Sequence, residues 1–522
     1  MARLTFRRPS RTTLLALTAG AAAALAHPPF GLLPGLLGYG LFLHLIDTVE
    51  GPRPLRAAFW RGWLVGAAYF GLGCWWVTEA FMVDIVRHGW MAPFALVVVS
   101  GGLALFWGAA AALYRRLAPA GWTRLLVFAG ALALMEWLRG MMFFPWNLPG
   151  ETWRAGSAPS QLASVIGAYG LTWVTLAIAA APALLFKAPR ARGARIVNAA
   201  ALIGLIGLYA TGAARMPAIE TKTDGPLIRI VQADVKQAAK YDQAYFQDIV
   251  DRYVRLTAQP AARTPDIVIW PEGAIPAEFS DYMSEGAWTR GAILSALKPG
   301  QVLIVGGYRT AGTFADPVYF NSLFVTRRTA QGIDLLGVYD KHRLVPFGEF
   351  LPLEDLIEPL GIKQLVGVGD GFTPGPHPAP LAAPGVPVVQ PLICYESLFP
   401  RYTRRGGKDD PAWIVNVSND AWFGQTSGPW QHLNLASYRA IEEGLPLIRS
   451  TPTGISAIID AYGRLIPNAQ IKLGEAGVID ATLPRALERT LYSRYGDTVF
   501  WLLITFSLAF TVRQIVRSVK FA

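Results

Sequence analysis

The sequence predicts two structural parts, a polytopic α-helical membrane domain and a layered α/β domain. Hydrophobic residues make up 52% of the 522 residues and charged residues only 16%, a balance that soluble proteins rarely have. Long apolar runs dominate residues 1–215 and recur at 496–514, whereas short β-like runs alternate with helix-like stretches over residues 225–485. We therefore expect a helical membrane domain, an α/β domain and a C-terminal membrane helix with these bounds.

Eight apolar runs are candidate membrane spans, because several reach the roughly 20 residues that a helix needs to cross a bilayer. They lie near residues 12–26, 29–47, 58–82, 91–114, 121–138, 160–186, 195–213 and 498–512. Pro and Gly interrupt the first two, for which a hydrophobic hairpin is the alternative. The N-terminus has the basic and apolar regions of a signal peptide, but the spans that follow closely favour an uncleaved first span.

Basic residues gather in alternate loops between these runs. They precede the first run and follow the second, fourth, sixth and last runs, whereas the other loops hold far fewer. The net charge of +11 therefore fits membrane orientation better than a nucleic-acid patch. Under the positive-inside rule, both termini are cytoplasmic and the long segment after residue 213 lies outside.

The α/β domain is predicted from seven short apolar runs separated by helix-like stretches. The helix-like stretches cover 242–258, 285–298 and 430–443, and the tract 372–387 is rich in Pro and is interpreted as a loop. The strand candidates are "LIRIVQA", "DIVIW", "VLIVGGY", "YFNSLFVT", "VVQPLIC", "AWIVNV" and "ISAIID".

Three polar residues lie at the ends of strand-like runs. Glu272 follows "DIVIW", Lys341 follows "LLGVYD", and Cys394 ends "VVQPLIC". Strand ends of α/β folds form rims that hold catalytic side chains rigidly. Taken singly, each has an ordinary explanation, because a lone cysteine is often a core residue and an exposed Glu–Lys pair needs no catalytic role. The only other cysteine, Cys74, lies far upstream, so no disulfide framework is expected.

Together the three residues are sufficient for acyl transfer through a cysteine. A thiol needs a base because it is mostly protonated at neutral pH. Glu272 could serve if partial burial raised its pKa toward neutrality. The Lys341 ammonium, helped by a backbone N–H near Cys394, could then stabilise the oxyanion of a tetrahedral intermediate.

The segments "WPEGAIP", "YDKHRLVPFGE", "LICYES" and "NVSNDAWFG", in this order, resemble the nitrilase superfamily of carbon–nitrogen hydrolases. With the membrane spans and "FFPWNLPGETW" between the fifth and sixth spans, the whole chain resembles the bacterial apolipoprotein N-acyltransferase family. The resemblance implies an αββα sandwich with Glu272 as general base, Lys341 as oxyanion stabiliser and Cys394 as nucleophile.

The resemblance also implies further site residues. Glu349 and Glu396 match acidic positions that would orient the lysine and the cysteine, and Tyr395 would lend its backbone N–H. Trp422 would line the acyl pocket, although an ordinary packed aromatic is the alternative. Tyr241 stands where the family often has a substrate-contacting tryptophan, in a segment that matches more loosely.

The implied reaction moves a fatty acyl chain from a phospholipid to a lipoprotein. The resemblance implies phosphatidylethanolamine as donor, a Cys394 thioester as intermediate, and the α-amine of a diacylglyceryl-modified apolipoprotein as acceptor. It places the enzyme in the bacterial inner membrane with a periplasmic catalytic domain, and it implies no cofactor. Residues 350–372 would form an apolar lid or a loop packed on its own domain.

Two other functions fit parts of the pattern. A membrane-anchored amidase would share the three residues but use water as acceptor, and a transporter or receptor would only bind a ligand with its outer domain. Nearly charge-free span interiors disfavour the transporter. His342 and His432 are interpreted as structural or surface residues, and no metal site is predicted because no metal-ligand spacing surrounds them.

Overall fold

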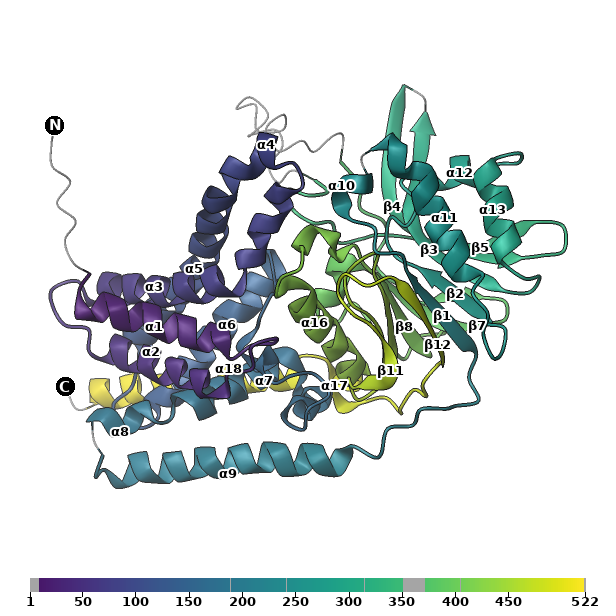
Figure 1. The fold of residues 1–522 in the computed structure, drawn as a ribbon. Helices are drawn as coiled ribbons and strands as arrows, with labels where there is room; N and C mark the ends of the chain where they lie inside the picture. Colours follow the sequence, from purple (N-terminus) through teal and green to yellow (C-terminus); the bar gives the residue numbers. More distant parts are fainter. Residues whose placement is uncertain are drawn as a thin grey trace, which may run out of the picture. The chain divides into compact units, whose positions relative to one another are not determined.

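The computed structural model describes residues 9–520, except residues 188, 241, 314, 351–370 and 404. The chain divides into two compact units (Figure 1). The helical unit comprises Met1–Pro217 and Tyr495–Ala522, and the sandwich unit comprises Ala218–Arg494. Each unit is described by itself below.

Each of the eight apolar runs of the sequence contains a helix. These helices are α1 (Arg11–Leu25), α2 (Leu37–Asp47), α3 (Pro54–Gly73), α5 (Ala92–Leu117), α6 (Arg124–Met142), α7 (Ala163–Ala180), α9 (Arg192–Arg215) and α18 (Thr498–Lys520). Within the described residues, four helical segments are long and apolar enough to cross a membrane: Ile85–Leu117, Arg124–Met142, Pro159–Phe186 and Arg192–Arg215. The apolar helices Arg11–Leu25, Leu33–Asp47 and Thr498–Thr511 are shorter, so the count of eight spans stays a prediction.

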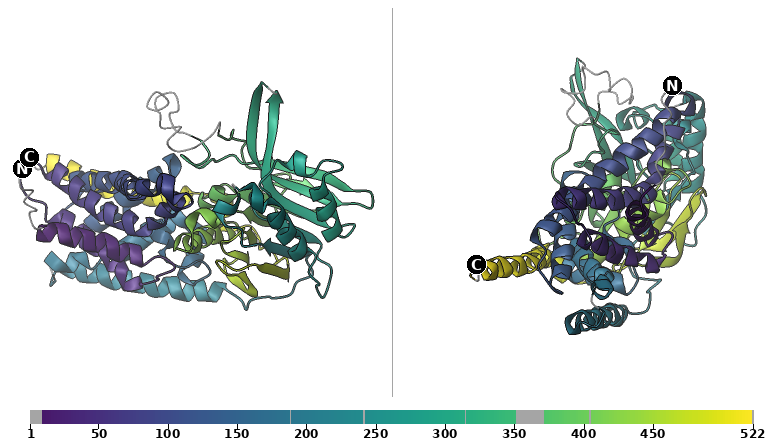
Figure 2. Two further views of the ribbon diagram at one scale, coloured as in Figure 1. Left: turned by 45° about the horizontal axis from the view of Figure 1, so that its top comes forward. Right: turned by 90° about the vertical axis from the view of Figure 1, so that its left-hand side faces the viewer.

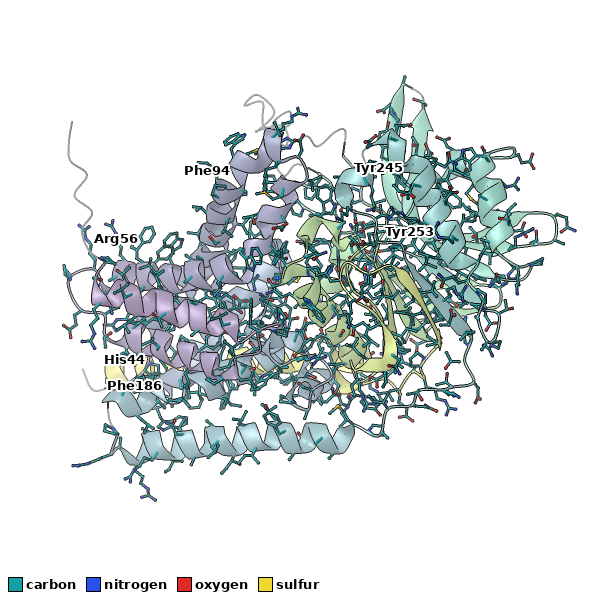
Figure 3. All side chains as sticks on the ribbon, in the orientation of Figure 1. His44, Arg56, Phe94, Phe186, Tyr245 and Tyr253 are labelled. Atoms are coloured by element: carbon teal, nitrogen blue, oxygen red, sulfur yellow. The ribbon has the colours of Figure 1, made fainter. Side chains whose placement is uncertain are left out.

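The surface of the helical unit is apolar, as a helix surface in contact with lipid has to be. Phe94 on α5 is 65% exposed and points away from the unit (Figure 3). Only 11% of the most apolar 18-residue segment of α9 is buried, and the side chain of Ile203 on this helix is 69% exposed. Inside the unit, glycine lets α3 approach α5 closely, since a Cβ on Gly62 would lie 2.5 Å from the carbonyl oxygen of Trp107.

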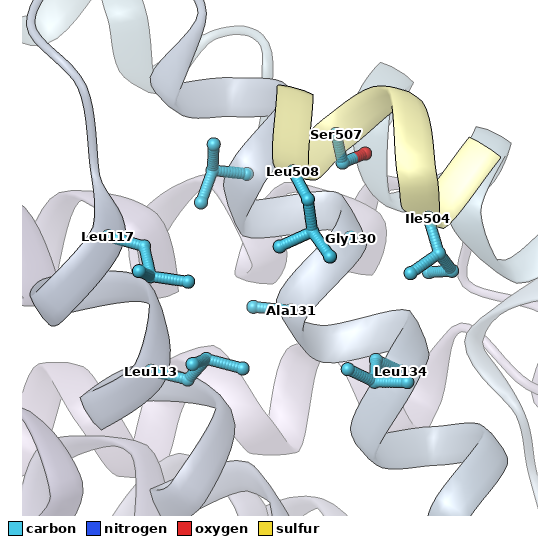
Figure 4. A pocket seen from close by; sticks show the side chains of 9 residues that line it. Leu113, Leu117, Gly130, Ala131, Leu134, Ile504, Ser507 and Leu508 are labelled. Carbon is cyan, nitrogen blue, oxygen red and sulfur yellow. The ribbon is translucent and has the colours of Figure 1, made fainter. Parts of the chain in front are cut away.

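Two apolar cavities lie within the helical unit. The first, about 10 Å³, is bounded by α5, α6 and α18, and its lining includes Leu113, Ala131 and Leu508 (Figure 4). The second, about 480 Å³, is lined by residues of α6, α7 and α9 that include Leu126, Trp173 and Gly204. Neither lining contains an ionisable side chain, so neither cavity offers acid–base chemistry.

A buried ion pair lies on α6 in the same unit. Glu136 and Arg139 are fully buried and paired, and Glu136 also accepts a hydrogen bond from Trp107 Nε1 at 2.6 Å. Arg139 donates to the carbonyl oxygens of Phe144 and Trp146 as well. The arginine therefore ties the segment after α6 back to the helix.

The described part of the sandwich unit contains two six-stranded sheets, with the orders β12-β1-β2-β3-β4-β5 and β11-β10-β9-β8-β7-β6. The first sheet consists of β1 (Leu227–Gln232), β2 (Ile267–Trp270), β3 (Val302–Thr313), β4 (Asp316–Arg328), β5 (Ile333–Asp340) and β12 (Gly477–Thr482). The second consists of β6 (Leu381–Ala383), β7 (Val386–Ile393), β8 (Trp413–Val417), β9 (Leu447–Ser450), β10 (Ser456–Ile459) and β11 (Leu465–Ile471).

The alternation of side chains along the strands gives the sheets two apolar faces each. One face of each sheet packs in a shared core, to which Ile230 and Ile269 contribute from the first sheet and Val415 from the second. On the outer face of the first sheet lie α11 (Phe246–Thr257), which carries Tyr253 (Figure 3), and α13 (Trp288–Ala296). The ring centroids of Tyr253 and Trp270 lie 5.0 Å apart. Helix α16 (Gly428–Glu443) covers the outer face of the second sheet.

This arrangement is the expected αββα sandwich. The seven strand candidates and the three helix-like stretches each contain an element of the expected type. The interpretation of residues 372–387 as a loop was wrong in part, because β6 within it pairs antiparallel with β7. The antiparallel strands β3 and β4 form a long hairpin that extends from the first sheet (Figure 2).

Candidate active site

Glu272, Lys341 and Cys394 all lie at strand ends, as expected. Glu272 follows β2 in the first sheet, Lys341 follows β5 in the same sheet, and Cys394 follows β7 in the second sheet. The side chain of Lys341 is 1% exposed and that of Glu272 is 9% exposed. An exposed surface ion pair is thereby excluded as the explanation of these two residues.

A glutamate–lysine cluster forms at the end of the first sheet. Lys341 Nζ lies 3.3 Å from Glu272 Oε1 and 2.9 Å from Glu349 Oε1. Asn321, on β4, donates from Nδ2 to the same two carboxylate oxygens at 2.7 Å each. The remaining oxygen of each carboxylate accepts a backbone N–H, from Asn419 for Glu272 and from Val345 for Glu349. The structure thus brings together the predicted residues Glu272, Lys341 and Glu349.

Cys394 sits on a sharp turn between β7 and the 3₁₀ helix η8 (Cys394–Leu398). Its φ angle is +47°, in the left-handed region that non-glycine residues rarely adopt, so surrounding contacts have to hold it. Ser397 Oγ donates to the Cys394 carbonyl oxygen at 2.8 Å. This turn presents the thiol at a partly exposed position, as nucleophile turns in other hydrolases do.

Glu396 joins the cysteine turn to the lysine segment. Its fully buried carboxylate accepts backbone N–H groups from Ile393, His342 and Arg343 and the hydroxyl of Tyr339, at 2.8–3.1 Å. Burial raises the pKa of this carboxyl in spite of these bonds. Glu396 therefore orients the chain on both sides of the site, which agrees with its expected supporting role.

A second polar network supports the turn from α16. His432 Nδ1 lies 3.0 Å from Asp420 Oδ1, and its Nε2 lies 3.1 Å from Ser397 Oγ and 3.3 Å from the Cys394 carbonyl oxygen. Asp420 also pairs with Arg449 at 2.8 Å. Burial and Arg449 lower the pKa of His432, which keeps the ring neutral. His432 is 1% exposed, so the structural interpretation fits it and the surface interpretation does not.

The resting site holds a protonated thiol and an ionised Glu272. Burial and the neighbouring Glu272 raise the pKa of Cys394 to about 12. Burial by itself would raise the pKa of Glu272, but Lys341, the Asn321 amide and Lys240 together lower it. The condition that partial burial should raise this pKa toward neutrality is therefore not met, because the cations and the amide outweigh desolvation. Transfer of the Cys394 thiol proton to the Glu272 carboxylate is therefore energetically unfavourable in the site without substrate.

Three contributions to the site were missing from the sequence interpretation: Asn321, the Asn419 backbone and Lys240. Lys240 ends α10 (Gln237–Lys240), and its charge interacts with those of Glu272 and Cys394. The paired glycines of "VLIVGGY" could have indicated a close approach of β3 to the site, since a Cβ on Gly306 would lie 2.6 Å from the Glu272 Cα. Asn321 could have been noticed as an amide inside an apolar strand.

The remaining predicted residues are placed as follows. Tyr395 is 5% exposed and stacks edge-on with Phe399 at 5.0 Å. Trp422 lies half-buried in η9 (Asp420–Phe423), three residues after Asn419, and its acyl-pocket role stays a prediction. Tyr241 and residues 351–370, which make up most of the expected lid, lie outside the described residues.

The sandwich and its site define the class of the protein. Residues 227–492 match the carbon–nitrogen hydrolase family, so this half of the chain is a nitrilase-type domain. An amidase from Nesterenkonia sp. is 16% identical in an alignment that covers 55% of this chain and 99% of the amidase, with a TM-score of 0.35.

The N-terminal part of the chain and the full-length relatives identify the family more specifically. Residues 19–181 match the apolipoprotein N-acyltransferase N-terminal domain. The chain is 57% identical to the apolipoprotein N-acyltransferase of Caulobacter vibrioides, over 96% of this chain and 94% of that protein. It is 39% identical to that of Bradyrhizobium diazoefficiens, over 97% and 95%. The chain belongs to the apolipoprotein N-acyltransferase family.

Proposed function

We propose that this enzyme transfers a fatty acyl chain from a membrane phospholipid to the N-terminal α-amine of a diacylglyceryl-modified apolipoprotein. Phosphatidylethanolamine is the proposed donor, and Cys394 carries the chain as a thioester between the two half-reactions. The helical unit would hold the enzyme in the bacterial inner membrane, with the sandwich unit on the periplasmic side and both termini in the cytoplasm.

The observation that supports this proposal is the Glu272–Lys341–Glu349 cluster at the ends of the strands, whose lysine and base interact electrostatically with Cys394. In the first half-reaction, Cys394 Sγ attacks the ester carbonyl carbon while Glu272 takes the thiol proton. The uphill proton transfer proceeds because a carbon–sulfur bond forms in the same step.

The oxyanion that results lies beside the Lys341 ammonium and the Tyr395 backbone N–H in this proposal. Burial disfavours the ammonium, but Glu272 and Glu349 more than compensate and raise the pKa of Lys341. Lys341 therefore stays charged while the oxyanion exists. Collapse of the intermediate breaks the carbon–oxygen bond, and Glu272 gives its proton to the departing lysophospholipid.

In the second half-reaction, the acceptor α-amine attacks the thioester carbonyl. Glu272 takes a proton from the attacking nitrogen, and Cys394 leaves as the thiolate that regains this proton. The product amide is more stable than the thioester, so transfer runs in one direction. Trp422 and Tyr241 are proposed to contact the substrate.

The test is mass spectrometry of the purified enzyme after incubation with phosphatidylethanolamine and no acceptor. Wild-type protein should gain one hydroxylamine-labile fatty acyl group on Cys394, and Cys394→Ala should gain none. Cys74→Ala is the matched control, because Cys74 is buried in the helical unit, and it should be acylated like wild type. Addition of a diacylglyceryl peptide should then move the chain to the peptide amine. An unacylated wild-type protein that hydrolyses small amides would refute the proposal in favour of an amidase.

A further inference from the structure

The second half-reaction releases one more proton than Glu272 can recycle; this inference rests on the function proposed above. An α-amino group has a pKa of about 7.7–8.0 and reaches the site mainly as an ammonium at neutral pH. The ammonium must lose one proton before it can attack, and the attacking nitrogen loses another as the amide forms. Glu272 returns only the second to the Cys394 thiolate. The first proton therefore has to go either to solvent or to a second base in the site.

Lys240 is half-buried, and its Nζ atom is buried close to the residue that follows Glu272. Its Nζ has no partner within the described residues, although the atom is buried. A Cβ on Gly273, the residue after Glu272, would lie 3.4 Å from this Nζ. The groups whose charges act on it are Glu272, after β2, and Cys394, after β7. Lys240 is thus a buried amine with open hydrogen-bonding capacity beside the reacting groups.

The two lysines of the site differ in their ability to release a proton. Lys341 Nζ lies within 3.3 Å of two carboxylate oxygens, which hold its ammonium charged. Lys240 makes no such bond to any residue that the structure describes, and burial lowers its pKa to about 8 although Glu272 and Cys394 act in the opposite direction. A buried lysine of this kind exists partly as the neutral amine at neutral pH and can act as a base.

We propose that Lys240 is the second base of the site and that its neutral amine takes the proton which the acceptor ammonium loses before it attacks the Cys394 thioester. The acceptor nitrogen then carries a lone pair, and Lys240 carries the extra proton as an ammonium. Glu272 accepts the proton that the nitrogen sheds on attack and passes it to the departing thiolate. Lys240 releases its proton to solvent after the product leaves, so protons balance over the cycle.

The experiment measures the two half-reactions separately in full-length Lys240→Met and Lys240→Arg enzymes. Methionine removes the amine, and arginine keeps a charge but cannot act as a base. Lys236→Met is the matched control, because Lys236 is exposed and lies four residues earlier. Thioester formation from phosphatidylethanolamine is followed first, and transfer to a diacylglyceryl peptide is then followed from the preformed thioester.

Both Lys240 variants should still form the thioester, which also establishes that they fold, and in both this step should slow far less than transfer. Lys240→Met should slow it more than Lys240→Arg, because methionine removes a charge that helps to keep the pKa of Glu272 low. Transfer to the peptide should slow about 10²-fold at neutral pH, the usual contribution of a general base. Higher pH should restore the transfer rate, because the α-amino group of the peptide is then already neutral when it binds. Hydroxylamine, a neutral nucleophile at neutral pH, should discharge all the thioesters at similar rates.

Three results would overturn the inference. Wild-type transfer in Lys240→Arg would mean that only the charge matters. A loss of thioester formation in both variants would assign Lys240 to the first half-reaction or to folding. Unchanged transfer in both would leave the lysine without a role. A wild-type enzyme that forms no thioester would instead contradict the proposed function, so the two failures are distinguishable.

Discussion

Both units of the molecule bury a glutamate beside a cation, yet the two cations differ in their other partners, which are backbone carbonyl oxygens for Arg139 and a second carboxylate for Lys341. In the helical unit, Arg139 donates to Glu136 and to the carbonyl oxygens of Phe144 and Trp146. In the sandwich unit, Lys341 lies 3.3 Å from Glu272 Oε1, and the Glu272 side chain remains 9% exposed.

This difference in partners distinguishes the Glu136–Arg139 pair, which we interpret as structural, from the Glu272–Lys341 pair, which we propose to be reactive. Arg139 is held rigidly by carbonyl oxygens of the backbone, so its loss would leave several buried acceptors unsatisfied. Glu272 shares its cation with Glu349, and its charge acts on the Cys394 thiol, whose proton it accepts in the proposed reaction. Burial and charge alone do not distinguish the pairs, whereas the partners of each atom do.

The largest effect is expected from Glu272→Gln, which removes the proposed base and keeps the size of the side chain. Thioester formation should fall by about 10²–10⁴-fold, the range that general-base catalysis contributes. The rate of acyl-adduct formation by mass spectrometry measures this. Glu278→Gln is the matched control, since Glu278 lies six residues later in the chain and its carboxylate accepts hydrogen bonds from Ser280 and Thr310. Wild-type acylation in Glu272→Gln would place the base elsewhere.

Arg139→Met tests the structural pair and should change stability rather than chemistry. Loss of one partner of a buried ion pair costs about 3–5 kcal/mol, because Glu136 would be left buried without its cationic partner. The thermal midpoint in detergent should fall, while thioester formation per folded molecule should stay at the wild-type rate. Arg154→Met, at an exposed position, should leave the midpoint in place. If Arg139→Met left the thermal midpoint unchanged and slowed thioester formation, the Glu136–Arg139 pair would have to be assigned a role in the reaction and not in stability.

The positions of the three main site residues followed from local sequence, because each polar side chain directly ends an apolar strand. The sandwich followed from strand-length apolar runs, and its αββα layering from the family resemblance. What could not be predicted depends on register and close packing. Asn321 pairs with Tyr308 across β3 and β4, and only this register brings its amide to both carboxylates.

Two further features also needed the structure. The direction of the Glu272 pKa shift depends on how many cations surround a buried carboxylate, and strand patterns do not report that number. Lys240 comes from the short helix α10, in the segment where the family resemblance is loosest. In the helical unit, the helices of the two apolar runs that Pro and Gly interrupt are short, since α1 has 15 residues and α2 has 11.

The smallest effect is expected from Asn321→Leu, which removes the amide that donates to Glu272 and Glu349. This hydrogen bond helps to lower the pKa of Glu272, so its loss raises that pKa. Glu272 accepts a proton only when ionised, and activity is lost as pH falls through its pKa. The acid limb of the pH profile for thioester formation should therefore move to higher pH in the variant.

At neutral pH the carboxylate of Asn321→Leu is still held ionised by Lys341, so the rate should fall only about fivefold, the equivalent of the roughly 1 kcal/mol that one hydrogen bond contributes. Thr326→Val on the same strand is the matched control, because the Thr326 hydroxyl bonds a backbone carbonyl oxygen and not a carboxylate. Its acid limb should stay where the wild-type limb lies. An acid limb in Asn321→Leu that stays in place, or moves to lower pH, would mean that Glu272 does not control the acid side of the profile. The reactive pair would then have to be sought among the other carboxylates of the site.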